Sequence, residues 1–287
     1  MKYILFLLML VAYHANAIIT RHDVEDKHYL AAPADFPALA TFYIDGAHGS
    51  FIKPNWIITA AHTTFCLQPG TKIKTTQGSA TVKRLHVHPQ HTPGVSHDIA
   101  LIELAEPVKY VQPAKLYKEQ DETGKLIWFI GIGGTGNGIT GITVDNYENK
   151  GVLRKAQNRV EQAVGPILKF KFDKGNKALP LEGISGGGDS GGPAYFKQGN
   201  SYYVVGLSSR YGGGPSEKYE SLEVYSRVSY FLPWITSIIA QPTLSINSGI
   251  SVEKLKHLPG GLKPTDLPSI CKDIVFTEDE LSANVQG

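Results

Sequence analysis

The sequence predicts an all-β protein of two similar halves, each with six short strands, followed by one short helix. The 287 residues include 30 glycines and 14 tyrosines, and only 19% are charged. This composition suits strands joined by tight turns better than helices. Short runs of Val, Ile, Phe and Thr alternate with turn residues along most of the chain. Such spacing is typical of a barrel or a sandwich.

The two halves join near Pro113, with six apolar runs on each side. The runs of the first half are residues 38–44, 49–52, 56–60, 71–75, 79–87 and 99–104. Those of the second half are residues 126–132, 151–164, 167–172, 193–196, 202–208 and 222–228. Residues 231–240 then predict an amphipathic helix, because their apolar side chains share one face: Phe231, Trp234, Ile235 and Ile238.

The first 17 residues predict a secretory signal peptide. Lys2 is followed by the apolar run 4–11, which is too short to span a bilayer, and then by Ala15-Asn16-Ala17. We therefore expect cleavage after Ala17 and a secreted or periplasmic protein. No later stretch suggests a membrane anchor. The formal net charge of +2 gives no reason to expect nucleic acid as a partner.

The segment Gly186-Gly187-Gly188-Asp189-Ser190-Gly191-Gly192-Pro193 is a poor helix and a poor core strand. Glycine tolerates positive φ and close backbone approach, so the run suits a tight turn that presents Ser190. The N–H groups of Gly188 and Ser190 could then point at one spot where an oxyanion forms. A serine hydroxyl needs an adjacent base, itself oriented by a third group, to act as a nucleophile.

Both partners have candidates upstream. His62 ends the apolar run 56–61, and Asp98 opens another apolar run. Each feature alone has an ordinary explanation: a surface turn at Ser190, a structural histidine, or an aspartate that caps a turn. Together, in order and at the ends of expected strands, they favour a catalytic set.

These three segments resemble the histidine, aspartate and serine boxes of the trypsin/chymotrypsin-like serine peptidases, and the resemblance spans residues 18–240. It implies two six-stranded antiparallel β-barrels, 18–112 and 113–240, with the active site in the cleft between them and a C-terminal helix. It further implies a monomeric, trypsin-like serine endopeptidase that cleaves peptides or proteins through an acyl-enzyme, without a cofactor. His62 is then the base, Asp98 its orienter, Ser190 the nucleophile, and the N–H groups of Gly188 and Ser190 the oxyanion hole.

The resemblance also assigns the substrate pocket. Ile184 stands six residues before the serine, where relatives that prefer Arg or Lys have an aspartate, so an apolar floor and an apolar or mixed preference are expected. Glu223, on the far wall, could still accept a basic side chain. Ser209 matches the family serine beside the buried aspartate. Cleavage after Ala17 would free the Ile18 ammonium to pair with Asp189.

The two cysteines, Cys66 and Cys271, are expected to form a disulfide in an oxidising compartment, with two free thiols as the alternative. So few cysteines suggest a divergent, bacterial-type branch of the family. Residues 241–287 lie beyond the family domain, and a disordered tail is the default expectation for them.

Three other patterns carry no site prediction. Residues 131–136 match the spacing of a dinucleotide loop, but glycines follow where a helix should begin, so we expect a strand end and a mobile loop. The histidines at 86, 88, 91 and 97 lack nearby cysteines or a free carboxylate, so no metal is expected. Residues 67–87 contain no carboxylate, so no calcium is expected there.

Three alternatives from other classes remain open: an inactive relative that only binds partners, an esterase without peptidase activity, and a structural or adhesion protein. The third gives no reason for three catalytic boxes. Labelling of Ser190 by a fluorophosphonate separates the first from an enzyme, and a comparison of peptide with ester substrates separates the second.

Overall fold

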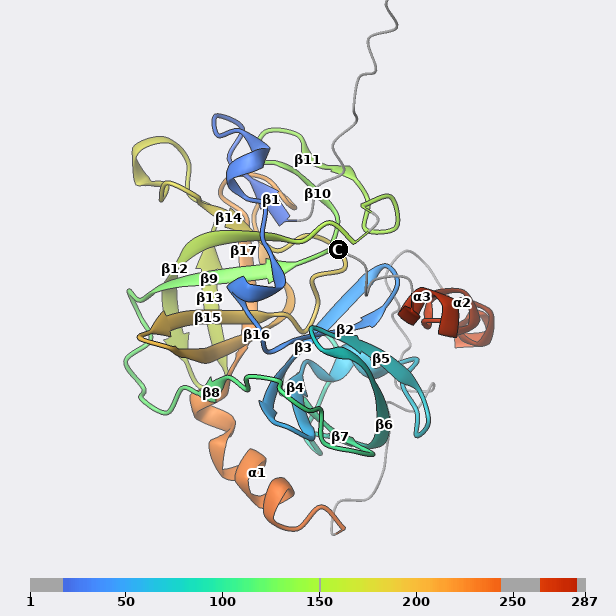
Figure 1. The fold of residues 1–287 in the computed structure, drawn as a ribbon. Coiled ribbons are helices and arrows are strands. Elements are labelled where there is room, and N and C mark those ends of the chain that lie inside the picture. Colours follow the sequence, from blue (N-terminus) through green and yellow to red (C-terminus); the bar gives the residue numbers. More distant parts are fainter. Residues whose placement is uncertain (1–17, 150, 244–263, 283–287) are drawn as a thin grey trace, which may run out of the picture.

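The computed structural model describes residues 18–149, 151–243 and 264–282, so the expected signal peptide lies outside the described residues. Two barrels lie next to each other, with helix α1 (Val228–Ala240) below them and helices α2 and α3 against the first barrel (Figure 1). No helix of the described part is long and apolar enough to cross a membrane.

The first barrel closes in the strand order β2-β3-β4-β7-β6-β5. Every residue of β2, β4 and β7 is buried, so these strands are covered on both faces of the barrel wall. The strands are β2 (Leu39–Tyr43), β3 (Gly46–Lys53), β4 (Trp56–Thr59), β5 (Lys72–Thr75), β6 (Gly78–Val87) and β7 (Ala100–Leu104).

The second barrel follows the order β15-β9-β12-β13-β17-β16 and closes through a β15–β16 pairing. Buried and open positions alternate along β12 and β13, as expected where one face of a strand packs on a core. The prediction of two six-stranded antiparallel barrels is confirmed; a short strand, β8 (Lys115–Leu116), adds in parallel to β16. The six strands are β9 (Leu126–Gly131), β12 (Arg154–Val164), β13 (Ile167–Lys171), β15 (Pro193–Gln198), β16 (Ser201–Gly213) and β17 (Leu222–Arg227).

Helix α1, close to the predicted one, seals the junction between the barrels. Phe231 and Ile235 are buried in an apolar cluster that contains residues of both barrels, such as Leu85 and Val204. The side chains of Trp234 and Ile238 are half-buried against the same cluster. This cluster therefore joins the two barrels, while the second barrel also has a separate apolar cluster of its own.

A small four-stranded sheet was not expected. Its order is β11-β10-β1-β14, from β1 (Ile18–Thr20), β10 (Thr135–Asn137), β11 (Gly141–Val144) and β14 (Gly183–Ile184). Ile18 and Ile19 are fully buried in it. The mobile loop expected after Gly131 is therefore wrong: this segment is tied to β1 and leads into an ordered strand pair.

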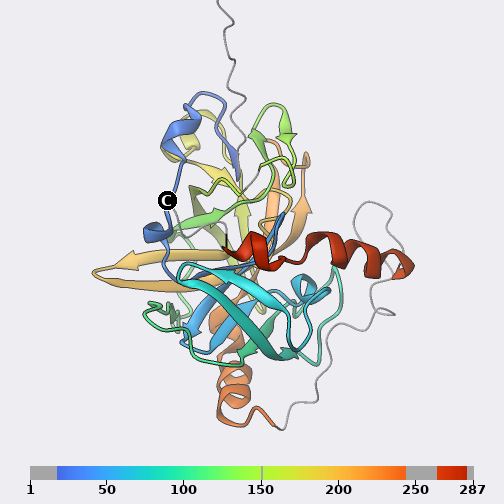
Figure 2. The ribbon, with the colours of Figure 1, turned by 45° about the vertical axis from the view of Figure 1, so that its right-hand side comes forward.

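The expectation of a disordered tail is wrong for residues 264–282. These residues form a turn of 3-10 helix (Pro264–Asp266), α2 (Leu267–Ile274) and α3 (Glu278–Ser282), which lie against the first barrel (Figure 2). Leu267 is buried among residues that include Ala61, which precedes His62, and Ala100, which begins β7. A disulfide joins Cys66 to Cys271, and Ile44 N–H donates to Ile274 O at 2.9 Å.

We predict that the Cys66→Ala/Cys271→Ala double variant lowers the free energy of unfolding by about 2–4 kcal/mol. The bond joins residues that are 205 positions apart, so it closes a long loop and lowers the entropy of the unfolded chain. Urea unfolding measures the loss. The single variant Leu267→Ala, which keeps the bond, reports the packing of α2 alone. Alkylation of both cysteines of the native protein without a reductant, seen by intact-mass analysis, would refute the bridge.

Candidate functional site

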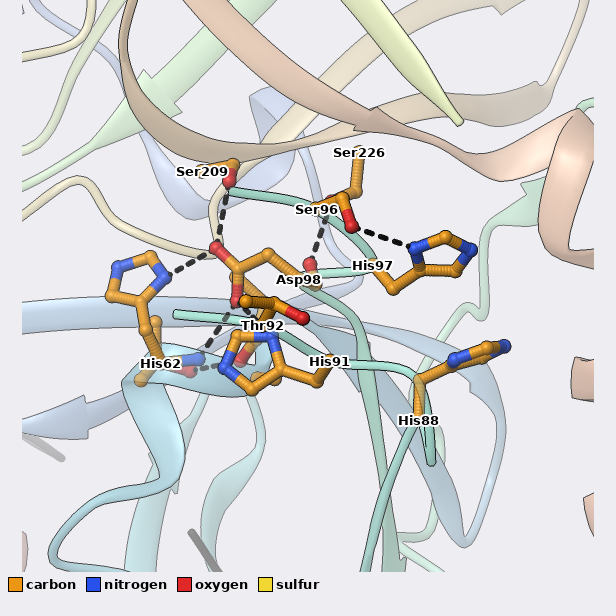
Figure 3. Close-up of polar contacts among 12 residues, drawn as sticks. His62, His88, His91, Thr92, Ser96, His97, Asp98, Ser209 and Ser226 are labelled. Atoms are coloured by element: carbon orange, nitrogen blue, oxygen red, sulfur yellow. Dashed lines mark hydrogen bonds and ion pairs between the residues drawn. The ribbon is translucent and has the colours of Figure 1, made fainter. Parts of the chain in front are cut away.

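His62 and Asp98 are held together by two hydrogen bonds. His62 lies in the 3-10 turn Ala61–Thr64 that directly follows β4, and Asp98 lies just before β7, the strand paired with β4. Asp98 Oδ1 accepts from His62 N–H at 2.9 Å, and Oδ2 is 2.7 Å from His62 Nδ1 (Figure 3). An ionised Asp98 fixes the proton of the neutral imidazole on Nδ1, which leaves Nε2 as a base.

The charge state of this pair follows from its surroundings. Burial opposes ionisation of Asp98, but His62, through its charge and its hydrogen bond, brings the pKa of the carboxyl down to about 2. Burial likewise opposes a charge on His62, yet the Asp98 carboxylate outweighs it and raises the pKa of the imidazole. The pair therefore favours a proton on His62, which a general base needs.

Asp98 also ties the second barrel to the first. Ser209, on β16, donates its hydroxyl to Asp98 Oδ2 at 2.7 Å, and Ser226, on β17, donates to the Asp98 carbonyl at 2.6 Å (Figure 3). Ser209, which the sequence matched to the serine beside a buried aspartate, is thus in direct contact with Asp98. Ser226 was not predicted, because no local pattern marks it.

Ser190 lies in the glycine-rich turn on the other side of the junction, with a half-buried side chain. Hydrogen bonds hold the turn: Asp189 N–H donates to Gly186 O at 3.0 Å, and Gly191 N–H to Ser208 O at 2.8 Å. Within the described chain, the N–H groups of Gly188 and Ser190 donate to no protein acceptor, and Ser190 Oγ makes no hydrogen bond to His62. Such contacts often tighten only when substrate binds.

The β2–β3 hairpin of the first barrel supports this turn. Ala47 N–H donates to Gly188 O at 2.7 Å, and His48 N–H donates to Ser190 O at 2.8 Å. A Cβ on Gly46 would lie 2.3 Å from Gly188 O, and Gly46 has a φ of +128°. Only glycine permits this approach. The hairpin therefore holds the carbonyl of Gly188. The N–H of Gly188 has no acceptor among the described residues.

Asp189, which precedes Ser190, is buried, and no cationic side chain of the described residues contacts it. Its carboxylate accepts from Gly133 N–H at 2.7 Å and Gly186 N–H at 2.8 Å. Burial raises the pKa of Asp189 to about 7, although these two donors oppose the rise. The described chain is continuous with residues 1–17, so Ile18 carries no ammonium group, and its pairing with Asp189 stays a prediction.

His48 is the histidine nearest to Asp189, with 3.9 Å between Nε2 and Oδ1. Ile132 N–H donates to Nε2 at 3.2 Å, and Nδ1 is 3.1 Å from Thr41 Oγ1. Burial lowers the pKa of His48 to about 4, so it is neutral at neutral pH and does not balance the charge of Asp189. Sequence reasoning missed His48, since it stands mid-strand without a motif.

The residues assigned to the substrate pocket occupy different environments. Ile184 is fully buried in an apolar cluster with Ile19 and Phe172, so it packs beneath the site and forms no exposed floor. Glu223 is half-buried, and its Oε2 accepts from Ser185 N–H at 3.1 Å and Ser185 Oγ at 2.7 Å. Burial raises the pKa of Glu223 to about 8, despite these donors. Sequence reasoning missed Ser185 as its partner.

The histidines that were weighed as metal ligands are spread over different contacts. His86 packs against Trp56, and His88 packs against Phe231 and Trp234 of α1. His97 lies next to His88 and has its Nδ1 2.9 Å from Ser96 Oγ. Of these four histidines, His91 has a ring that faces the Asp98 carboxylate, with 3.9 Å between Nδ1 and Oδ1 (Figure 3).

Comparisons with known proteins agree with this geometry. The family model described as Trypsin matches residues 27–235, which include His62, Asp98 and Ser190. The chain is 30% identical over 215 residues to chymotrypsin-like elastase family member 1 of Canis lupus familiaris, covering 67% of this chain and 80% of that protein. It is 27% identical over 228 residues to a tryptase of Mus musculus, covering 68% and 79%.

The buried carboxyl of Asp189 predicts different pH dependences for two N-terminal forms. A raised folded pKa gives stability that is present below the ordinary pKa and is lost as pH rises through about 7. We expect the form that keeps Asn16 and Ala17 to lose more unfolding free energy between pH 5 and pH 8 than the form that begins at Ile18. The excess should be on the order of 1–4 kcal/mol, because only the second form has an ammonium for Asp189.

Both forms carry Ser190→Ala, which prevents self-digestion during urea unfolding. Glu182 and Glu223, whose pKa values burial raises to about 7 and about 8, are common to both forms and cancel in the comparison. Parallel stability curves for the two forms would contradict the Ile18–Asp189 pairing.

Proposed function

We propose that this chain, which belongs to the trypsin family of serine peptidases, is a secreted endopeptidase that hydrolyses peptide bonds through His62, Asp98 and Ser190. The observation that carries the proposal is the pair of hydrogen bonds between Asp98 and His62. These bonds leave His62 Nε2 free at the junction where the second barrel contributes Ser190. Peptides and proteins are the substrates that this family membership implies.

In the proposed reaction, Ser190 Oγ attacks the carbonyl carbon of the scissile peptide while His62 Nε2 takes the hydroxyl proton. Asp98 stabilises the imidazolium that forms, and the N–H groups of Gly188 and Ser190 bind the oxyanion. His62 then gives the proton to the leaving amine, which leaves an acyl-enzyme on Ser190. Water, deprotonated by His62, attacks this ester, and His62 returns the proton to Ser190 Oγ as the acid product leaves.

The free N–H groups support the oxyanion assignment. Gly188 has a φ of +94°, and a Cβ there would lie 2.7 Å from Asn146 Cβ and 2.8 Å from Asp45 O. Asn146 Nδ2 donates to both Asp45 O and Asp45 Oδ2, so these two residues close the outer side of the turn. The Gly188 carbonyl is held on Ala47, and its N–H is left to face substrate.

Secretion is supported by two features. Residues 1–17 have the pattern of a signal peptide. The Cys66–Cys271 bond is stable in an oxidising compartment, whereas cytosolic thiols are usually kept reduced. Cleavage after Ala17 would start the mature chain at Ile18, already buried in the small sheet with β10 and β14.

Glu223 supports a substrate preference that changes with pH. Oε2 is held by Ser185, and the side chain remains partly exposed. Below a pKa of about 8 the carboxyl is neutral and suits uncharged side chains; above it, the carboxylate offers a counter-charge to Lys or Arg. This refines the mixed preference expected from the sequence.

We predict that Ser190→Ala and His62→Ala each lower kcat by a factor on the order of 10⁵–10⁶, because such groups act as a unit. Ser190→Ala should unfold at the same temperature as the parent, since the turn is held by backbone hydrogen bonds. Peptide hydrolysis and fluorophosphonate labelling are the measurements. Ester cleavage without peptide cleavage would make the chain an esterase, and an unlabelled, inactive parent would make it a binding protein.

For Glu223, we predict that the ratio of kcat/KM for a lysine substrate to that for the matched phenylalanine substrate rises roughly tenfold between pH 6.5 and pH 9. The ratio removes effects common to both substrates, such as the titration of His62. Glu223→Gln should keep a flat ratio, because its amide does not ionise. A ratio that rises equally in the variant would assign the lysine preference to another group.

A further inference from the structure

His91 is buried next to Asp98, and no role has yet been given to it. It lies in the segment between β6 and β7, where His91 N–H donates to His88 O at 2.9 Å. Its residue exposure is 7%, and neither ring nitrogen makes a hydrogen bond. The distance from Nδ1 to Asp98 Oδ1 is 3.9 Å, so the ring faces the carboxylate (Figure 3).

The groups around the ring are acceptors or the catalytic imidazole. Besides Asp98, the ring faces the carbonyls of Ser96 and His97 from its own segment and the ring of His62 from the turn after β4. The Asp98 carboxylate and the carbonyls of Ser96 and His97 are all acceptors, so a ring N–H has groups to donate to here that a phenyl ring could not use. Packing alone therefore does not account for a histidine at this position.

The Asp98 carboxylate is unevenly supplied with donors. Oδ2 receives His62 Nδ1–H and the Ser209 hydroxyl, whereas Oδ1 receives only His62 N–H. The free side of Oδ1 is the one that His91 Nδ1 faces. A shift of about 1 Å would bring Nδ1–H into hydrogen-bond range of Oδ1. Of the two neutral tautomers, only the one protonated on Nδ1 is compatible with an ionised carboxylate there.

We propose that His91 is a positioning residue: as a neutral Nδ1–H donor, it holds Asp98 through Oδ1, so that Oδ2 stays aligned with His62. This inference rests on the proposed function only in its kinetic consequences. Burial lowers the pKa of His91, even though Asp98 opposes the change, so the ring is neutral when the enzyme works.

The proposed role of His91 predicts the direction in which the pKa of His62 changes when His91 is replaced. The N–H dipole of His91 offsets part of the negative charge that His62 feels from Asp98. Without this dipole, the carboxylate attracts the His62 proton more strongly, and the pKa of His62 rises. Because His62 must be neutral to act as a base, the acid limb of kcat/KM moves to higher pH.

The test uses His91→Phe, which keeps the ring but removes its nitrogens, and His91→Asn, whose amide N–H can replace Nδ1–H. His88→Asn is the matched control, since His88 is a buried histidine of the same segment that packs on α1 and not on Asp98. For His91→Phe, we expect the acid limb of the kcat/KM profile to move to higher pH by about half a unit or more. We also expect kcat to fall about tenfold, with KM little changed. In His91→Asn the acid limb should lie at the parental pH again, and in His88→Asn it should not move.

A second readout does not need turnover. NMR titration of the His62 ring gives its pKa directly, and thermal unfolding shows whether each variant is folded. If the parent proves inactive, the proposed function fails, but a rise in the His62 pKa in His91→Phe still supports the coupling. A folded His91→Phe protein with the parental His62 pKa would overturn the inference. An equal loss of activity in His91→Phe and His91→Asn with an unmoved pKa would also overturn it, because that result describes packing alone.

Discussion

The ionised carboxylate of Asp98 is the interaction on which the rest of the site depends. It fixes the orientation of His62 through two hydrogen bonds and accepts a third from Ser209 of the second barrel. A buried carboxylate is unfavourable unless donors surround it, so the same contacts that orient His62 also keep Asp98 charged. The junction between the barrels is thus held by the group that the chemistry needs, and the site cannot be assembled by either half alone.

The buried acidic groups of the second barrel lie in a different environment from that of Asp98. Asp189 and Glu223 accept hydrogen bonds from backbone and hydroxyl donors, no cationic side chain in the described part of the chain contacts them, and burial raises the pKa of both. Each carboxyl therefore lacks a counter-charge. A positive charge brought from outside its own pocket would stabilise the ionised form. In our proposal, that charge is the new N-terminus for Asp189 and a basic side chain of the substrate for Glu223. One physical feature thus links processing to substrate choice.

The sequence was sufficient for whatever is local. The twelve barrel strands have a clear apolar pattern, and His62, Asp98 and Ser190 each lie in a short segment with its own signature. Contacts set by register across elements had no such signal, and these include Ser185 with Glu223 and His91 with Asp98. Strands of two or three residues, such as β1 and β14, are too short to show a period. Helix α2 has eight residues, so its stability comes from docking and not from its own composition.

The last described helices give the chain an order of assembly. The hairpin that carries Gly46 contacts the Ser190 turn on one side. On the other it pairs with the segment after α2, through Ile44 with Ile274 and a bridge from Tyr43 to Val275. During synthesis, Cys271 emerges 205 residues after Cys66. The hairpin next to the Ser190 turn therefore receives its outer support only after the segment with Cys271, Ile274 and Val275 has been made. A nascent chain would carry Ser190 long before this brace exists, so the hairpin beside the Ser190 turn lacks that support until the segment with Ile274 and Val275 has docked.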